Sequence, residues 1–322
     1  MGREPRSMYS ALVPLIGALI TLMSGVNSRL AGIVGNLVAT LVIHVVGLAG
    51  VSALLLVKRE QVRPLSGQGR LPVYYYLGGF VGVATVFSSI YAFAALGAAL
   101  AVALALLGQA LFSLAVDATG FLGRTRYPLS LRRLPGIGLA VAGVAIMGAA
   151  FVGQPDVGQG SAAVNGGSSA LAMLVALGSG VLPGLTFILN SELGRRKGIV
   201  RSTRANYVTG LATTLVIVLA VRPPAAEAAH AVVTAGPFLA LGGGLLGVTV
   251  VTAMNFIFPR MPAFSATLLL FSGQALSGVL IDAVAEGALD ARKLVGTFVL
   301  LVGLAVNALL TRGAETGRRV VS

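Results

Sequence analysis

Apolar segments of about 20 residues, each free of charged side chains, recur along the whole of this chain. A segment of that length crosses a hydrocarbon core of about 30 Å as a helix, because only a helix satisfies its backbone amides internally in lipid. Such segments cover 11–28, 37–57, 73–95, 98–116, 134–152, 170–190, 205–221, 236–258, 262–281 and 294–311. The sequence therefore predicts an all-α integral membrane protein with ten transmembrane helices.

The composition supports this class. Hydrophobic residues make up 56% of the chain and charged residues only 10%, whereas soluble domains carry about 25% charged residues. Cys is absent, which excludes disulfides and thiolate metal sites, and we expect no metal and no other cofactor. Residues 1–10 and the apolar run after them could mimic a signal peptide, but we expect a retained span because nine more follow.

The basic residues are distributed unequally between alternate loops. With a cytoplasmic N-terminus, 19 of the 23 Lys and Arg residues fall on the cytoplasmic side, and only Arg29, Arg222, Arg292 and Lys293 fall outside. This is the positive-inside tendency. It predicts cytoplasmic N- and C-termini in a bacterial-type inner membrane. It also explains the net charge of +13 without a nucleic-acid partner.

Scarce residue types recur at a fixed offset. An offset of 163 residues relates Asn27 to Asn190 and Gly47 to Gly210, and an offset of 165 relates Gln109 to Gln274. We interpret residues 1–152 and 170–322 as two five-helix repeats, joined by an extracytoplasmic Gly/Ser-rich linker at 153–169. Five is an odd number of crossings, so the second repeat is inverted in the membrane.

The repeated motifs are Asn-x-x-Leu, Gly-Gly-x-x-Gly and Gly-Gln followed by Asp, in the same order in both repeats. Their positions are Asn27, Leu30, Gly78, Gly79, Gly82, Gly108, Gln109, Asp117, and Asn190, Leu193, Gly243, Gly244, Gly247, Gly273, Gln274, Asp282. This pattern resembles the YdcZ-type family of inner-membrane proteins, within the drug/metabolite transporter (DMT) superfamily. The resemblance implies tandem five-helix units and transport, as export, of a small solute.

Polar residues at lipid depth are candidates for a substrate pathway. Gln109 and Gln274 lie about two helical turns before Asp117 and Asp282, which close the fourth and ninth spans. The two Gln amides either contact solute or bond across helices. The two Asp side chains act in gating, or form interfacial pairs with Arg124 or Lys293.

Further candidates lie in the first two spans of each repeat. Asn27 and Asn190 end their spans, where they line the pathway or only cap the chain. Asn206 is a single polar residue at lipid depth. His44, whose equivalent is Tyr207, could act as a proton relay. No acid lies one turn away and Tyr207 cannot titrate in its place, so neutral packing is favoured. The two Gly-Gly-x-x-Gly clusters serve close packing or act as hinges.

These observations favour a secondary transporter that exposes a small solute alternately to the two sides. The alternative is a lipid-carrier flippase, which ranks second because no basic residue lies at lipid depth. An enzyme is not expected, and no residue is predicted to be catalytic, because the spans contain neither an acid–base pair nor a metal cluster. Monomer and homodimer both remain open.

Overall fold

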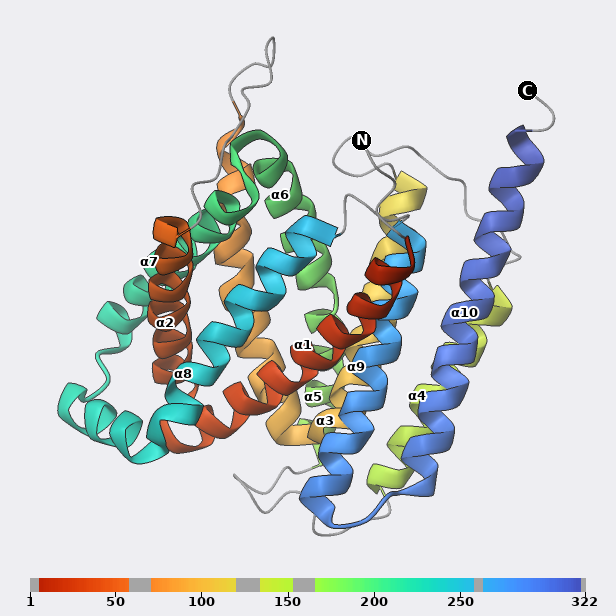
Figure 1. Ribbon diagram of the computed structural model, residues 1–322. Coiled ribbons are helices and arrows are strands. Elements are labelled where there is room, and N and C mark those ends of the chain that lie inside the picture. The colour runs from red at the N-terminus through yellow and green to blue at the C-terminus, as the bar shows by residue number, and fades with distance from the viewer. Residues whose placement is uncertain (1–5, 58–70, 120–133, 153–165, 258–262, 320–322) are drawn as a thin grey trace.

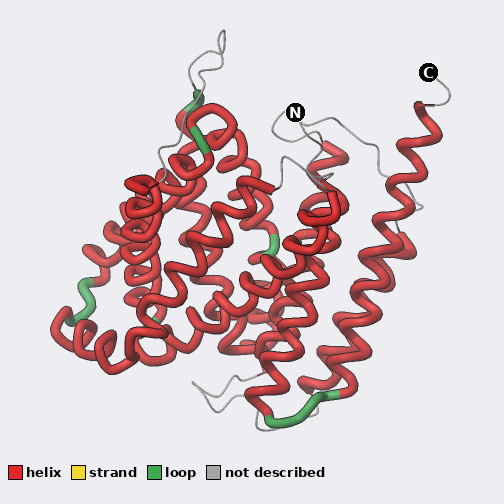
Figure 2. The backbone as a smooth tube through the Cα atoms, viewed as in Figure 1, coloured by secondary structure: helices red, strands yellow, loops and turns green. Residues whose placement is uncertain are grey.

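The computed structural model describes residues 6–57, 71–119, 134–152, 166–257 and 263–319. All regular structure in these ranges is helical, as Figure 2 shows. The elements are α1 (Arg6–Val34), α2 (Asn36–Val57), the short 3-10 helix η1 (Val73–Leu77), α3 (Gly78–Thr119), α4 (Leu134–Val152), α5 (Gly166–Ser179), α6 (Val181–Lys197), α7 (Ile199–Val221), α8 (Ala225–Ile257), α9 (Ala263–Glu286) and α10 (Ala291–Arg319).

Two long helices contain a backbone break. Gly97 interrupts α3 with φ 74° and ψ 170°, and Gly236 interrupts α8 with φ 81° and ψ 162°. Only glycine adopts these angles without strain. The predicted segments 73–95 and 98–116 are therefore two arms of α3 that turn back on each other at Gly97.

Within the described residues, six helical stretches are long and apolar enough to cross a membrane, and two shorter apolar helices accompany them. The longest stretch, Val73–Phe112, contains the break at Gly97. The protein is therefore a multi-pass helical membrane protein. The basic loops 58–70 and 120–133, and residues 153–165 of the predicted linker, lie outside the described residues, whereas Gly166 already begins α5.

The connections after α1 and α6 consist of one glycine each. Gly35 has φ 79° and its N–H donates to the carbonyl of Ala31 at 2.8 Å; Gly198 has φ 102° and donates to Gly194 at 2.9 Å. The prediction that the first and sixth helices end near residues 28 and 190 is therefore wrong. Both helices continue for about two more turns, and Arg29 is an exposed residue of α1.

Helices from residues 6–152 pack against helices from residues 166–319. The α1 helix lies against α8 and α9, while α5 and α6 lie against α3. The α2 helix contacts α7 and α8, and α4 contacts α10 at one edge of the bundle (Figure 1). The largest buried cluster contains residues of α1, α3, α9 and α10, so the two parts of the chain share one core.

Candidate functional site

A cavity of about 180 Å³ lies at the centre of this arrangement. Residues of α1, α2, α3, α5, α6, α7, α8 and α9 line it. Six of the nine pathway candidates are among them: Asn27, His44, Gln109, Asn206, Tyr207 and Gln274. Asn190 and Asp282 lie outside the lining, and the side chain of Asp117 is outside what the structure describes.

Gln109 and Gln274 occupy equivalent helix crossings. An added Cβ at Gly180 would meet the backbone carbonyl of Ala105 and, at 2.7 Å, the backbone nitrogen of Gln109. At Gly17 the same atom would meet the carbonyl of Leu270 and, at 3.0 Å, the nitrogen of Gln274. Glycine at these two positions lets the helices touch through their backbones, and so brings each Gln to the cavity.

Asn27 and Asn190 are buried inside α1 and α6, at 2% and 1% exposure, so they are not helix caps. The Asn27 side-chain oxygen lies against Gly243, and that of Asn190 lies against Gly78. In the second part of the chain the Asn190 amide also donates to Oδ1 of Asn206 at 3.0 Å. Ile43 stands at the position equivalent to Asn206 and offers no such acceptor to Asn27. Asn27 and Asn206 line the cavity, and Asn190 does not.

His44 and Tyr207 meet where α2 crosses α7. Their rings are 6.0 Å apart in an edge-to-face arrangement, and each ring lies against a glycine of the opposite helix, Gly210 or Gly47. His44 Nδ1 donates to the carbonyl of Thr40 at 2.8 Å. Within the described part of the chain no carboxylate lies beside the imidazole, so the geometry offers no acid partner for a relay.

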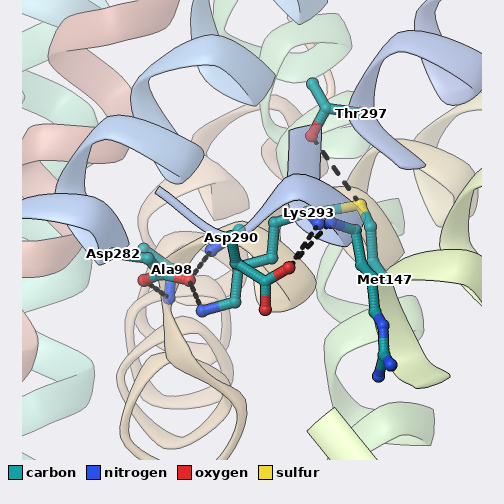
Figure 3. A network of polar contacts seen from close by, with 8 residues as sticks. Ala98, Met147, Asp282, Asp290, Lys293 and Thr297 are labelled. Carbon is teal, nitrogen blue, oxygen red and sulfur yellow. Dashed lines mark hydrogen bonds and ion pairs between the residues drawn. The ribbon is translucent and has the colours of Figure 1, made fainter. Parts of the chain in front are cut away.

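Asp282 takes part in a separate network at the turn of α3 (Figure 3). Its carboxylate accepts from the backbone N–H groups of Ala98 at 2.8 Å and Ala99 at 3.1 Å, and from Lys293 Nζ at 3.1 Å. The carboxylate thus caps the second arm of α3 and joins it to α9 and α10. The ion pair with Lys293 is the interfacial pairing that the sequence suggested as one alternative.

The two Gly-Gly-x-x-Gly clusters lie in close contacts. An added Cβ at Gly79 would meet backbone atoms of Asn206 and Gly210, and one at Gly244 would meet Val46 and Gly47, the last at 2.9 Å. The positive-φ breaks in these helices lie elsewhere, at Gly97 and Gly236.

Sequence reasoning missed a set of hydroxyl groups in the cavity wall. They belong to Thr21, Ser24, Thr85, Ser89, Ser179 and Thr186. A helical spacing signal was available in α1, where Ser24 precedes Asn27 by three residues and Thr21 precedes Ser24 by three, so each is a neighbour of the next on the helix surface. Thr21 Oγ1 donates to the backbone carbonyl of Gln274 at 3.1 Å and joins α1 to α9.

The two ends of the cavity differ. Toward the α3 turn the wall includes Ser89 and Ala92. An offset of 165 residues relates these to Met254 and Ile257, which are absent from the wall and buried at 2% and 4% exposure with Ile16. Larger side chains therefore fill the end away from the turn, and the cavity extends toward the turn.

Comparisons with known proteins agree with this architecture. A family described as "Putative inner membrane exporter, YdcZ" has a model that matches residues 8–146 and 171–306, two separate segments of the chain. A solved structure described as "Crystal structure of protein" is similar to this chain, with 18% sequence identity and a TM-score of 0.59. The match covers 98% of this chain and 100% of the chain in that structure. That likeness shows a shared fold. A comparison with curated proteins gives no match.

Proposed function

This chain belongs to the YdcZ family of inner membrane exporters within the DMT superfamily, and from that premise we propose that it is a secondary transporter. A small solute binds in the central cavity, and the two ends of the cavity open alternately. The family is a class of exporters rather than of enzymes, and the proposed direction is out of the cytoplasm.

The observation that supports the proposal most strongly is that residues from both parts of the chain form the cavity wall. Equivalent positions from both parts of the chain face the same space, including the Gln109–Gln274 and His44–Tyr207 pairs. A site built from two related units at their interface is typical of transporters with inverted repeats, because rocking one unit against the other exposes the site to either side.

We propose ten spans with both termini in the cytoplasm. Three features support this count. The break at Gly97 divides α3 into two segments, α5 and α6 form one apolar stretch, Ala170–Lys197, and the part of α8 after Gly236 is one more. With α1, α2, α4, α7, α9 and α10 these segments correspond to the ten apolar stretches of the sequence. The α1 helix begins and α10 ends at one end of the bundle (Figure 1), which fits an even number of crossings. The charge bias of the loops then assigns that end to the cytoplasm.

The test is solute loss from liposomes that contain the purified protein. Vesicles are loaded with a defined mixture of small polar and amphipathic solutes, and mass spectrometry follows what remains inside. We expect at least one solute to leave faster than from protein-free vesicles. Gln109→Ala and Gln274→Ala should abolish the difference while both variants stay folded; equal loss with and without protein contradicts the proposal.

A further inference from the structure

We propose that the central cavity binds a small solute without formal charge, one that carries both hydrogen-bond donors and acceptors on an apolar body. This inference rests on the proposed function and names the class of its substrate. It follows from the charge of the cavity wall, from the polar groups left without partners there, and from the cavity volume.

The cavity wall contains no Asp, Glu, Lys or Arg among the described residues. The buried ionic group of the region, Asp282, lies outside the wall and is engaged by Lys293 and two backbone N–H groups. A charged solute would therefore lose its hydration shell without meeting an opposite charge. Burial of an unpaired ion is far more costly than burial of a neutral polar group, so the wall discriminates against anions, cations and zwitterions.

Neutral polar groups in the wall are available for a solute. No hydrogen bond within the described part of the chain involves the side-chain amides of Gln109 or Gln274, although both residues are only 9% exposed. The Thr186 hydroxyl oxygen is buried and also lacks a partner there. Unsatisfied buried groups are costly, so a ligand that supplies complementary donors and acceptors gains their interaction. Each Gln amide offers both kinds of group.

The volume and the remaining wall define the rest of the solute. Ile20, Val86, Phe93, Phe187, Val250 and Leu270 supply apolar surface from several helices. A volume of about 180 Å³ is slightly larger than the roughly 150 Å³ cavity that accommodates benzene, and is below the range of drug-sized pockets. A single ring, or a short branched chain with one polar group, fits this description.

Four compounds of nearly equal size isolate the effect of charge: benzamide, benzoate, benzamidinium and the zwitterion leucine. Binding to the purified full-length protein in detergent is measured by equilibrium dialysis and by the rise in unfolding temperature that a bound ligand produces. We expect benzamide to bind at least about tenfold more tightly than each charged compound. Equal or tighter binding of any charged compound, or no binding of benzamide, overturns the proposal.

A negative charge placed in the cavity wall should raise the affinity for the cation benzamidinium relative to benzamide. Misfolding would weaken binding and would not produce this gain. Gln109→Glu and Gln274→Glu should each gain affinity for benzamidinium relative to benzamide. Asn36→Asp is the matched control: its amide donates to the Phe87 carbonyl at 3.4 Å, outside the cavity wall, so the same change there should leave the preference as it was. A benzamidinium preference that does not respond to either Glu substitution contradicts the assignment of this cavity.

The failure of this inference can be distinguished from the failure of the proposed function. If reconstituted protein moves only charged solutes, the transporter stands and the uncharged substrate class falls. If benzamide binds selectively at Gln109 and Gln274 but no solute crosses the liposome membrane, the substrate class stands and transport falls.

Discussion

The two parts of the chain match each other at the helix crossings that flank the cavity, but they differ at the two ends of the cavity. At the crossings, equivalent residues make equivalent contacts. Gly17 lies against the backbone of Leu270 and Gly180 against the backbone of Ala105, and each of these residues precedes a cavity Gln by four positions. At the two ends, equivalent positions hold unlike side chains: Ser89 lines the cavity at one end, and its equivalent Met254 is buried at the other. Backbone packing between the two parts is therefore preserved, while side-chain size decides which end of the cavity is filled.

The largest predicted effect concerns the network that holds the α3 turn. Asp282→Ala removes the acceptor of two backbone N–H groups and breaks the buried ion pair with Lys293, which should lower the free energy of unfolding by about 3–5 kcal/mol. Asp290→Ala, which removes a cap from the start of α10, should cost only about 0.5–2 kcal/mol. Detergent-solubilised protein unfolded with denaturant gives both values, and equal losses would show that the buried network contributes nothing special.

The filled end should tolerate truncation less well than the open end. Met254→Ala removes a fully packed side chain and should cost about 2–5 kcal/mol. Ser89→Ala should be nearly neutral, because the Ser89 hydroxyl donates to the Val86 carbonyl of its own helix at 3.0 Å. Similar costs at these equivalent positions would remove the asymmetry on which the comparison depends.

The crossings should respond equally in both parts of the chain. Gly17→Ala and Gly180→Ala each place a methyl group against the backbone of the opposing helix and should cost about 1–3 kcal/mol. Gly138→Ala in α4 is the control, because an added Cβ there meets nothing within 4 Å, and it should cost nothing. A large cost at one crossing only would argue against equivalent packing.

The smallest effect should come from a single hydrogen bond between two helices of the cavity wall. Thr21→Val removes the hydrogen bond to the Gln274 carbonyl and should cost about 0.6 kcal/mol, the average for such bonds between membrane helices. Thr249→Val is the control, because Thr249 is exposed and its hydroxyl bonds only within its own helix, to Leu245. A difference in unfolding free energy well above 1 kcal/mol would indicate that Thr21 supports more than this contact.

The sequence predicted much of the fold because membrane helices leave a direct signal. Apolar length predicted a multi-pass helical membrane protein, and the gap between the predicted segments 73–95 and 98–116 falls at the Gly97 break in α3. Helix ends were less accessible. Arg29, which the charge pattern assigns to the extracytoplasmic side, is an exposed residue of α1, a helix that continues beyond the apolar stretch. A charged residue there locates the edge of the apolar stretch, not the end of the helix.

The candidate site was partly predictable for a similar reason. Rare amides at equivalent positions pointed to Gln109 and Gln274, which line the cavity. The hydroxyl groups of Ser89 and Thr186 were missed because Ser and Thr are common in membrane helices and bond to their own backbone. The sequence shows that Ser89 and Met254 differ in size, but only the packing of the helices shows that these positions lie at opposite ends of one cavity.

The most direct test of alternating access uses cysteines at the two ends. The chain has no native Cys, so Ser89→Cys and Met254→Cys can each be labelled alone with a membrane-impermeant maleimide, in intact cells and in inverted vesicles. If the two ends open alternately, residue 89 reacts from the extracytoplasmic side, and residue 254 reacts more slowly and only from the cytoplasmic side. Reaction of both residues from one side would contradict alternating access.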